Sequence, residues 1–364
     1  MASGPLVYVG NYTNVAPFAR GRAGGIGVYR LDRESGALEP LQVAAGSYNP
    51  TWLTLSPDRR FLYAVDAVPE LDGVPGGAVS AWSVDPTTGF LTFINRQSTG
   101  GPGPCHVSVE ASGRYALATN YAGGSVAMLP RRADGGLDPL SDFHQHAGSG
   151  PNPRRQERPH AHSINADPTN RYAFVCDLGL DRVVAYRLDL EGGKLVYDES
   201  RTVVARPGVG PRHLAWHPDG RHAFVLNELD GSVDAFAFDS TDCRLTRTSF
   251  APGLPAGFAG DNTAAEVRVL PNGRFVYGSQ RGHDSIAIWS FDEKAGKLTH
   301  VGNQPSDGKT PRNFTIDAAG RLMLVAHQDD DRVVAFRIDP ETGGLTPTGA
   351  VSECPSAVCL RIVE

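Results

Sequence analysis

The sequence lacks the features that mark nucleic-acid-binding and membrane-bound proteins. Its 34 Lys and Arg residues are outnumbered by 40 Asp and Glu, so the net charge is −6 and no excess of basic groups is present to attract nucleic acid or an anionic membrane. No apolar run approaches the length of a membrane span, and the N-terminus has no basic segment followed by a long apolar stretch. We therefore expect no nucleic-acid partner, no membrane association and no signal peptide.

Cysteine and the common catalytic motifs are also scarce. The five cysteines form an odd, scattered set without a Cys-x-x-Cys motif, and they are Cys105, Cys176, Cys243, Cys354 and Cys359. This usage predicts reduced thiols in a cytoplasmic protein. The Gly-x-Ser-x-Gly, Walker and Rossmann motifs are missing, so nothing indicates a serine nucleophile or a nucleotide, and we expect no cofactor.

Glycine and proline, by contrast, are abundant (42 and 27 residues), and they punctuate an internal repeat. Each copy opens with Pro-x-x-φ-x-φ, where φ is apolar, passes through a turn rich in Pro, Asp and Gly, and resumes with Arg and a second apolar run. The copies start at Pro50, Pro104, Pro159, Pro211 and Pro311, with a degenerate copy at Ala264. The arginines after the turn recur about every 50 residues, a period typical of propellers and solenoids. They are Arg60, Arg114, Arg171, Arg221, Arg274 and Arg321.

Each repeat unit contains four short runs with the character of β-strands. In the unit that starts at Pro211, these runs are His213–His217, His222–Asn227, Val233–Phe238 and Leu245–Phe250. Four antiparallel strands in a unit of this size make one propeller blade. No long segment has the period of a helix, which argues against a βα solenoid.

The two ends of the chain supply one further blade. Leu6–Asn11 resembles the second strand of the other units, and Gly27–Leu31 and Leu38–Val43 follow as its third and fourth strands. The first strand comes from the C-terminus, where Pro355–Leu360 repeats the opening motif. This closure removes an exposed sheet edge. We therefore predict an all-β, seven-bladed β-propeller in which residues 1–364 form a single domain.

One face of this ring is predicted to carry the functional site. Because the first two strands of a blade form a hairpin, the loop that enters strand one and the loop that leaves strand two share one face. The long insertions fall on that face, and they are Asn11–Gly25, Asp66–Gly77, Phe143–Pro159 and Ala251–Ala265. Variable loops on a rigid scaffold are where binding and catalysis concentrate.

Ionisable residues gather at the strand ends on the same face. The first strands start with Trp52, His106, His162, Arg212 with His213, Glu266, and Arg312 with Asn313. The second strands end with Asp66, Asn120, Asp177, Asn227 with Glu228, Gln280 with Arg281, and His327. A hairpin turn near Asp219 should place Arg212 opposite Asn227 and beside Glu228. Glu228 is then either a general base or simply the ion-pair partner of the arginine.

Metal binding is a second interpretation of the longest insertion. Four histidines lie in or beside it: His144, His146, His160 and His162. In a strand, the imidazoles of a His-x-His pair point to opposite faces, and no carboxylate-rich cluster completes a ligand set, so we do not expect a metal there. The insertion also carries a basic loop with Arg154, Arg155 and Arg158, which suits an anionic small molecule.

These motifs together resemble a known family, the seven-bladed propeller lactonases. The family comprises the bacterial propeller-type 6-phosphogluconolactonases and the fungal carboxy-muconate lactonizing enzymes. The resemblance covers nearly the whole chain. It rests on Tyr8-Val9-Gly10-Asn11-Tyr12-Thr13, Arg155-Gln156-Glu157, Pro159-His160-Ala161-His162, Gly210-Pro211-Arg212-His213, Asn227-Glu228-Leu229-Asp230-Gly231-Ser232-Val233 and Lys309-Thr310-Pro311-Arg312-Asn313-Phe314.

The resemblance implies a metal-independent site that hydrolyses a small anionic, sugar-derived lactone, with 6-phosphogluconolactone as the first choice of substrate. The catalytic residues that it implies are His162, Arg212, Glu228 and Arg281, with Arg268 and Arg312 as other candidates for the second arginine. Glu228 or His162 would activate water, and the arginines would bind the anionic group or the oxyanion. The residues expected to contact substrate are His106, Arg155, His160, His213, Glu266, Arg268 and Arg312.

Other functions remain open at this point. Carboxy-muconate cycloisomerisation and hydrolysis of unphosphorylated sugar-acid lactones would use the same face. A non-catalytic interaction platform is a third possibility, because a propeller fold by itself specifies no function. Such a platform would expose aromatic and apolar anchors, whereas this face is polar and ionisable. The sequence does not predict the oligomeric state.

Overall fold

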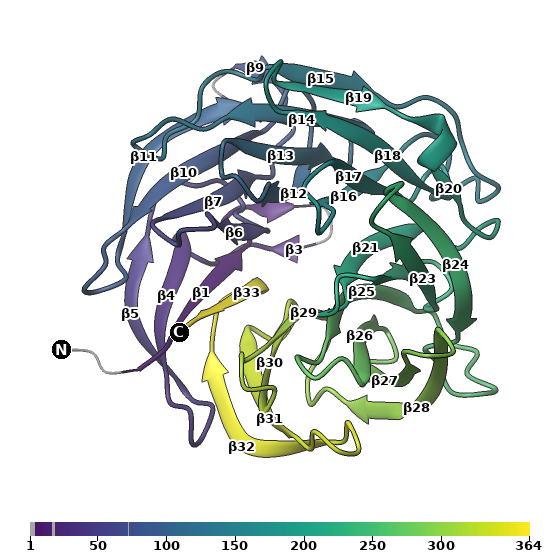
Figure 1. Ribbon diagram of the computed structural model, residues 1–364. Helices are drawn as coiled ribbons and strands as arrows, with labels where there is room; N and C mark the ends of the chain where they lie inside the picture. Colours follow the sequence, from purple (N-terminus) through teal and green to yellow (C-terminus); the bar gives the residue numbers. More distant parts are fainter. Residues whose placement is uncertain (1–3, 17–18, 72) are drawn as a thin grey trace.

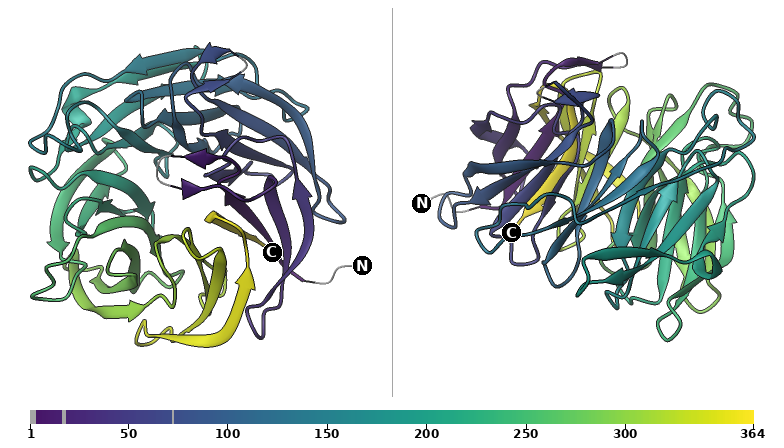
Figure 2. Two further views of the ribbon diagram at one scale, coloured as in Figure 1. Left: turned by 180° about the vertical axis from the view of Figure 1, so that it is seen from behind. Right: turned by 90° about the horizontal axis from the view of Figure 1, so that it is seen from above.

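The computed structural model describes residues 4–16, 19–71 and 73–364, and it arranges them as seven antiparallel sheets around a central axis (Figure 1). Six sheets have four strands and the remaining one has five. Seen from above, the sheets stand side by side as blades (Figure 2). The prediction of an all-β, seven-bladed propeller is confirmed. In these described ranges, no helix is long and apolar enough to cross a membrane.

The strands take equivalent places in every blade, numbered here from the axis outward. The first strands are β6 (Leu53–Leu55), β12 (Pro104–Val109), β16 (Ala161–Ala166), β21 (Pro211–Trp216), β25 (Thr263–Val269), β29 (Pro311–Ile316) and β33 (Ala357–Val363). The second strands are β7 (Phe61–Asp66), β13 (Tyr115–Asn120), β17 (Tyr172–Asp177), β22 (His222–Asn227), β26 (Phe275–Arg281), β30 (Leu322–His327) and β1 (Leu6–Asn11). The third strands are β10 (Ala78–Val84), β14 (Ser125–Pro130), β18 (Arg182–Asp189), β23 (Val233–Asp239), β27 (Ser285–Asp292), β31 (Arg332–Ile338) and β4 (Ile26–Leu31). The fourth strands are β11 (Leu91–Ser98), β15 (Asp142–Gln145), β19 (Lys194–Tyr197), β24 (Arg244–Ala251), β28 (Lys297–Pro305), β32 (Leu345–Glu353) and β5 (Leu38–Ala44).

A few short elements lie outside this scheme. They are the β2–β3 hairpin (Val15–Ala16 and Ala19–Arg20), the β8–β9 hairpin (Glu70–Leu71 and Val74–Pro75), β20 (Val203–Val204) and the 3-10 helix η1 (Glu199–Arg201). The two hairpins belong to the first two insertions that were expected on the functional face. In the right-hand view of Figure 2, the purple β2–β3 hairpin stands out beyond the ends of the blades.

Strands from both ends of the chain close the ring, as predicted. The sheet order is β33-β1-β4-β5, and Leu6 pairs with Val363 in the antiparallel register of β1 and β33. The first and last strands of the chain, β1 and β33, therefore lie side by side in the same blade (Figure 1). Pairing β33 with β1 satisfies backbone groups that would otherwise form a free sheet edge.

A hydrogen bond that repeats between blades explains the glycine before the fourth strand. The hydroxyl of Tyr8 donates to the carbonyl of Gly89 (2.8 Å), and the hydroxyl of Tyr277 donates to that of Gly343 (2.9 Å). Both glycines have a positive φ, at 71° and 72°. A Cβ on Gly89 would also lie 1.9 Å from Leu6 Cδ1 in the next blade. Glycine is needed there both for the turn and for the close approach of two blades.

A β-bulge lies near the start of six first strands, and in β33 its extra residue is Val358. In the other five strands it directs side chains toward the functional face. Across the β21–β22 pair, Pro211 lies opposite Asn227 and His213 opposite Leu226, so Arg212 is the extra residue. The same register shift passes over single residues in β12, β16 and β29, and those residues are Cys105, His162 and Arg312. In β25 it passes over both Ala265 and Glu266. Bulges of this kind re-aim side chains beside active sites.

This bulge corrects one expectation from the sequence. Arg212 was expected to lie opposite Asn227, but Pro211 takes that place. Regular alternation from the turn cannot reveal one inserted residue. The expected meeting of Arg212 with Glu228 nevertheless occurs.

Candidate active site

A cavity of about 1260 Å³ opens on the predicted functional face. All four insertions contribute to its wall, through Tyr12 and Asn14, Ala67 to Glu70, Arg155, and Asp261 to Thr263. The bulge residues Cys105, His162 and Arg312 also line it. The structure thus places the long loops and the re-aimed strand residues around one space.

One position of the blade repeatedly supplies residues to the cavity wall. It is the last residue of the second strand or the residue immediately after that strand. In six of the seven blades it belongs to the cavity wall, and these residues are Tyr12, Ala67, Tyr121, Glu228, Arg281 and Gln328. Sequence reasoning identified Glu228 and Arg281 but missed Tyr12, Tyr121 and Gln328. Aligning the repeat units at the polar residue before this position would have found all three.

Three arginines from three different parts of the chain surround the carboxylate of Glu228. Arg212 Nε lies 2.8 Å from Glu228 Oε2, and Arg281 Nη2 lies 3.1 Å from the same oxygen. Arg155, from the longest insertion, donates to Oε1. The side chain of Glu228 is only 6% exposed. One buried anion therefore organises three cations.

This arrangement keeps Glu228 ionised and weakly basic. Burial by itself would raise the pKa of the carboxyl, but the charges of Arg281, Arg212 and Arg155 outweigh it and hold the pKa below its ordinary 4.5. Burial is the main cause that lowers the pKa of Arg281 from 12.5 to about 9. The positive charge of Arg212 lowers this pKa further, whereas the negative charge of Glu228 opposes the shift. Arg281 still carries its proton at neutral pH.

Arg281 is also oriented by the backbone. Its Nε donates to the carbonyl of Thr263 (3.2 Å), and its Nη2 donates to that of Ala264 (2.9 Å). The guanidinium is therefore fixed at the cavity wall rather than free to rotate. Fixed donors can stabilise developing negative charge without reorganising during a reaction.

His162 presents an uncharged imidazole to the same cavity. Burial lowers the pKa of His162 well below 6.5, and the positive charge of Arg212 adds to this shift. Within the described part of the chain, its ring nitrogens have a single hydrogen-bonding contact, between Nδ1 and Cys105 Sγ at 4.0 Å. Its ring packs edge-on against Tyr121 and His213, with centroids 5.4 Å and 5.0 Å away. A neutral, weakly engaged imidazole is able to accept a proton.

Arg155 and a fourth arginine, Arg312, differ in their surroundings. Arg155 is 34% exposed at its side chain and also donates to the hydroxyl of Tyr121 (3.2 Å). Arg312 lines the cavity and donates to the amide oxygen of Gln328 (3.2 Å), a neutral partner. Both guanidinium groups border the cavity and are suited to meet an anionic ligand.

The remaining predicted residues lie behind the cavity wall. Arg212 contacts the site through Glu228, and the others are His106, His160, His213, Glu266 and Arg268, none of which lines the cavity. His213 Nδ1 lies 3.3 Å from Glu266 Oε2, and Arg268 Nε lies 3.2 Å from Glu266 Oε1. His106 packs against Trp52 at 4.4 Å. His106, His160, His213 and Glu266 are buried, whereas the side chain of Arg268 is 33% exposed.

The histidines of the longest insertion do not gather around one point. His144 contacts Asp142 (3.0 Å), and His146 contacts Asp177 (2.6 Å). The ring of His160 stacks on Tyr121 with centroids 4.5 Å apart. Each histidine is engaged by its own partner, so these side chains do not build a shared ligand set.

Comparison with known proteins shows the family to which the chain belongs. Residues 6–362 match the family model described as "Lactonase, 7-bladed beta-propeller". The chain is 34% identical to a 6-phosphogluconolactonase of Bacillus subtilis over 98% of both chains, and 31% identical to one of Formosa agariphila over 93% of this chain and 94% of that one. Among solved structures, a periplasmic gluconolactonase of Pseudomonas aeruginosa matches with a TM-score of 0.92 at 35% identity, over 99% of each chain. The chain belongs to the seven-bladed β-propeller lactonase family.

Proposed function

We propose that this protein hydrolyses 6-phosphogluconolactone to 6-phosphogluconate. The observation that carries the proposal is the buried Glu228 surrounded by Arg155, Arg212 and Arg281, beside the neutral imidazole of His162. This site lies in a member of a lactonase family whose relatives include 6-phosphogluconolactonases. The cluster supplies cations for an anionic substrate and a proton acceptor for water.

His162 is the proposed general base. A base must be deprotonated at the working pH, and the lowered pKa of His162 ensures this at neutral pH. Glu228 is also deprotonated, but three guanidinium groups occupy its oxygens and weaken its affinity for a proton. In the proposed reaction, His162 takes a proton from water while the water oxygen attacks the lactone carbonyl carbon. The ring C–O bond then breaks, and the proton passes to the departing oxygen.

Arg281 is proposed to stabilise the negative charge that forms on the carbonyl oxygen. Its guanidinium borders the cavity and is held by backbone carbonyls, so it is oriented before substrate arrives. Glu228 pairs with Arg281 (3.1 Å) and is itself held by Arg212 (2.8 Å). Glu228 therefore serves as the anchor of the arginine cluster in this proposal, rather than as the base.

Arg155 and Arg312 are proposed to bind the phosphate. Both line the cavity, and Arg155 is the more exposed member of the Glu228 cluster. A phosphate can replace the carboxylate of Glu228 as the partner of Arg155, because guanidinium groups bind both anions in the same geometry. A sugar phosphate is an intracellular substrate. We accordingly propose a cytoplasmic location, which suits the five free cysteines.

Hydrolysis of an unphosphorylated sugar lactone is a second candidate. The observation in its favour is the close structural match to a periplasmic gluconolactonase. The same base and oxyanion donor would serve both reactions. The two candidates differ in the work of Arg155 and Arg312, which would contact phosphate in one case and only sugar hydroxyl groups in the other.

An initial-rate assay separates these candidates. Freshly prepared 6-phosphogluconolactone and gluconolactone are compared at equal concentration, each corrected with a buffer blank because lactones hydrolyse spontaneously. We expect a higher kcat/KM on the phosphorylated substrate, unchanged by a chelator. Hydrolysis of gluconolactone alone would transfer the activity to the second candidate. Turnover of neither lactone would overturn both, and carboxy-muconate would then be the next substrate to assay.

A further inference from the structure

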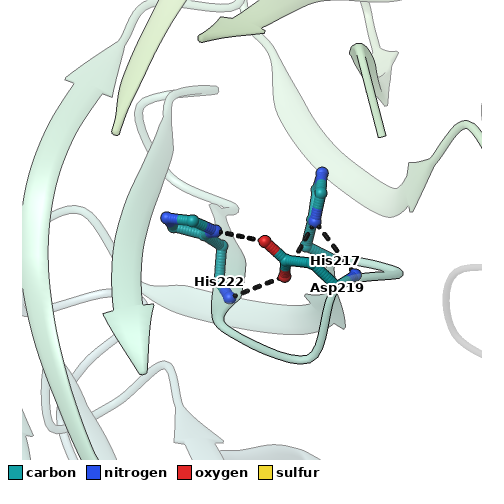
Figure 3. A group of neighbouring side chains, drawn as sticks. All are labelled: His217, Asp219 and His222. Atoms are coloured by element: carbon teal, nitrogen blue, oxygen red, sulfur yellow. Dashed lines mark hydrogen bonds and ion pairs between the residues drawn. The ribbon is translucent and has the colours of Figure 1, made fainter. Parts of the chain in front are cut away.

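We propose that His217, Asp219 and His222 form a binding site for a divalent transition-metal ion, with Zn²⁺ as the first choice (Figure 3). The three residues lie in and beside the turn that joins β21 to β22. One potential ligand atom from each lies within 4.8 Å of the other two. Two imidazoles and one carboxylate are a ligand set that zinc uses in proteins, with water in the fourth position.

The distances between the ligand atoms suit a small cation. His217 Nδ1 lies 2.8 Å from Asp219 Oδ1, and His222 Nδ1 lies 2.8 Å from Asp219 Oδ2. Figure 3 shows the carboxylate between the two rings. Tetrahedral bonds of about 2.0–2.2 Å place ligand atoms about 3.5 Å apart. The ligand atoms of the three residues lie from 2.8 Å to at most 4.8 Å apart, and this range includes that separation.

The hydrogen bonds of His217 leave its Nδ1 atom with conflicting partners. Nε2 lies 3.0 Å from the carbonyl of Gly273, which can only accept, so this nitrogen carries the proton. Nδ1 then holds a lone pair and accepts from the backbone N–H of Asp219 (3.2 Å), yet it also lies beside Asp219 Oδ1. Either a second proton on Nδ1 or a metal ion shared by the lone pair and the carboxylate resolves this conflict, and titration with Zn²⁺ distinguishes the two. Metal-binding histidines typically donate their other N–H to a carbonyl in this way.

The two histidines distinguish this turn from the equivalent turns of the other repeat copies. The residues equivalent to His222 in the other copies are apolar or aromatic: Phe61, Tyr115, Tyr172, Phe275 and Leu322. The residues equivalent to His217 are Ser56, Glu110, Asp167, Leu270 and Asp317. Folding of the turn therefore requires an imidazole at neither place. Only the copy in this blade brings two imidazoles to one carboxylate.

The neighbouring blade leaves room for the ring of His217. A Cβ on Gly273, in the equivalent turn of the next blade, would lie 2.4 Å from His217 Nε2. An ion at this site would therefore fix His217 Nδ1 within its own turn, while Nε2 keeps its hydrogen bond to Gly273 of the adjacent blade. One competing cation is present, because the exposed Arg221 has Nε 3.6 Å from Asp219 Oδ2, but it also pairs with Glu293 at 2.6 Å.

The proposed metal site is separate from the active site. The turn lies at the opposite end of β21 from Arg212, and a strand of this length spans about 20 Å. The inference therefore does not depend on the proposed lactonase activity. An ion at this place would fix the β21–β22 turn without taking part in hydrolysis.

Calorimetric titration of the chelator-treated, full-length protein with Zn²⁺ tests the proposal. We expect one tight site per chain, and visible absorption bands of tetrahedral Co²⁺ when that ion is used instead. His222→Phe places in the turn the residue found at Phe61 and Phe275, so it should fold. This substitution removes a direct ligand. It should therefore weaken Zn²⁺ binding by more than the roughly 10- to 100-fold that is typical when a residue that only hydrogen-bonds to a ligand is lost. Asp219→Asn should do the same.

His144→Gln is the matched control, because it removes a partly exposed histidine from another blade. It should bind Zn²⁺ as the wild type does. The proposal is overturned if the wild-type protein shows no stoichiometric site, or if both His222→Phe and Asp219→Asn bind as tightly as the wild type. A supporting result also includes a higher Tm with Zn²⁺ in the wild type and no such rise in His222→Phe.

Discussion

Replacing Arg155 with Ala tests whether this arginine reads the phosphate or only supports Glu228. In the free protein, Arg155 donates to Glu228 and to Tyr121, and its side chain is 34% exposed. A hydrogen bond to a charged group contributes about 1.5–3 kcal/mol. Releasing Arg155 from a partly exposed ion pair costs about 0.2–1 kcal/mol of that gain. The net loss of about 1–2 kcal/mol corresponds to a fall in kcat/KM of about 5- to 30-fold.

The assay compares 6-phosphogluconolactone with gluconolactone, because only the first carries the phosphate. We expect Arg155→Ala to lower kcat/KM for the phosphorylated substrate by the stated factor and to change that for gluconolactone less than about threefold. Arg154→Ala is the control, since Arg154 is exposed on the same loop and does not line the cavity. An equal fall on both substrates would mean that Arg155 acts through Glu228, and an equal effect of Arg154→Ala would refute a specific phosphate contact.

Three further predictions concern the centre of the site. Glu228→Gln should reduce the free energy of unfolding by about 3–5 kcal/mol at pH 7, because it leaves Arg212 and Arg281 without their buried anion. The folded-state pKa of Glu228 is below its ordinary 4.5, so its contribution to the free energy of unfolding is complete above pH 4.5 and is lost as the pH falls below that value. Urea titrations should therefore show the stability difference between wild type and variant shrinking below pH 4.5. A stability difference that does not change with pH would contradict this reasoning. His162→Gln should lower kcat by about 10²–10⁴-fold. In the wild type, kcat should fall at acid pH, well below pH 6.5, as His162 becomes protonated, and the variant should lose this fall. A variant that keeps the fall in kcat at acid pH would exclude His162 as the base. Cys105→Ala should retain activity and the wild-type protein should react slowly with iodoacetamide at pH 7, because burial raises the pKa of the thiol to about 11; rapid inactivation by the reagent would show that Cys105 is a reactive thiolate.

The repeat made the architecture predictable because each blade is built from local contacts. Turn residues and strand length recur with the period, and a glycine precedes the fourth strand in most copies, with Cys243 at a positive φ of 54° in its place before β24. Even the closure by β33 and β1 could be inferred, because the C-terminal motif supplied the strand that the first blade lacked. Where boundaries differed, they did so by one to three residues, since apolar patterns do not mark where pairing stops.

The sequence predicted less well which residues meet at the site and which of them line the cavity. Arg212 and Glu228 meet because a hairpin joins them, and this short-range contact was foreseen despite the bulge at Arg212. Arg155 reaches Glu228 from a long loop of another blade, and no periodic pattern reports the path of such a loop. Whether a residue lines the cavity or lies behind it, as His106 and His213 do, depends on packing across several blades.

The sequence alone therefore determined the number of blades, the face that carries the site and the hairpin that joins Arg212 to Glu228. Only the tertiary structure decided which residues meet around the cavity and which are buried behind it. It also decided that His217, Asp219 and His222 lie within reach of one ion, although the turn motif had placed them close in sequence. The physical reason is that strand pairing depends on neighbours along the chain, whereas the charge and burial of a site depend on side chains brought together from separate blades.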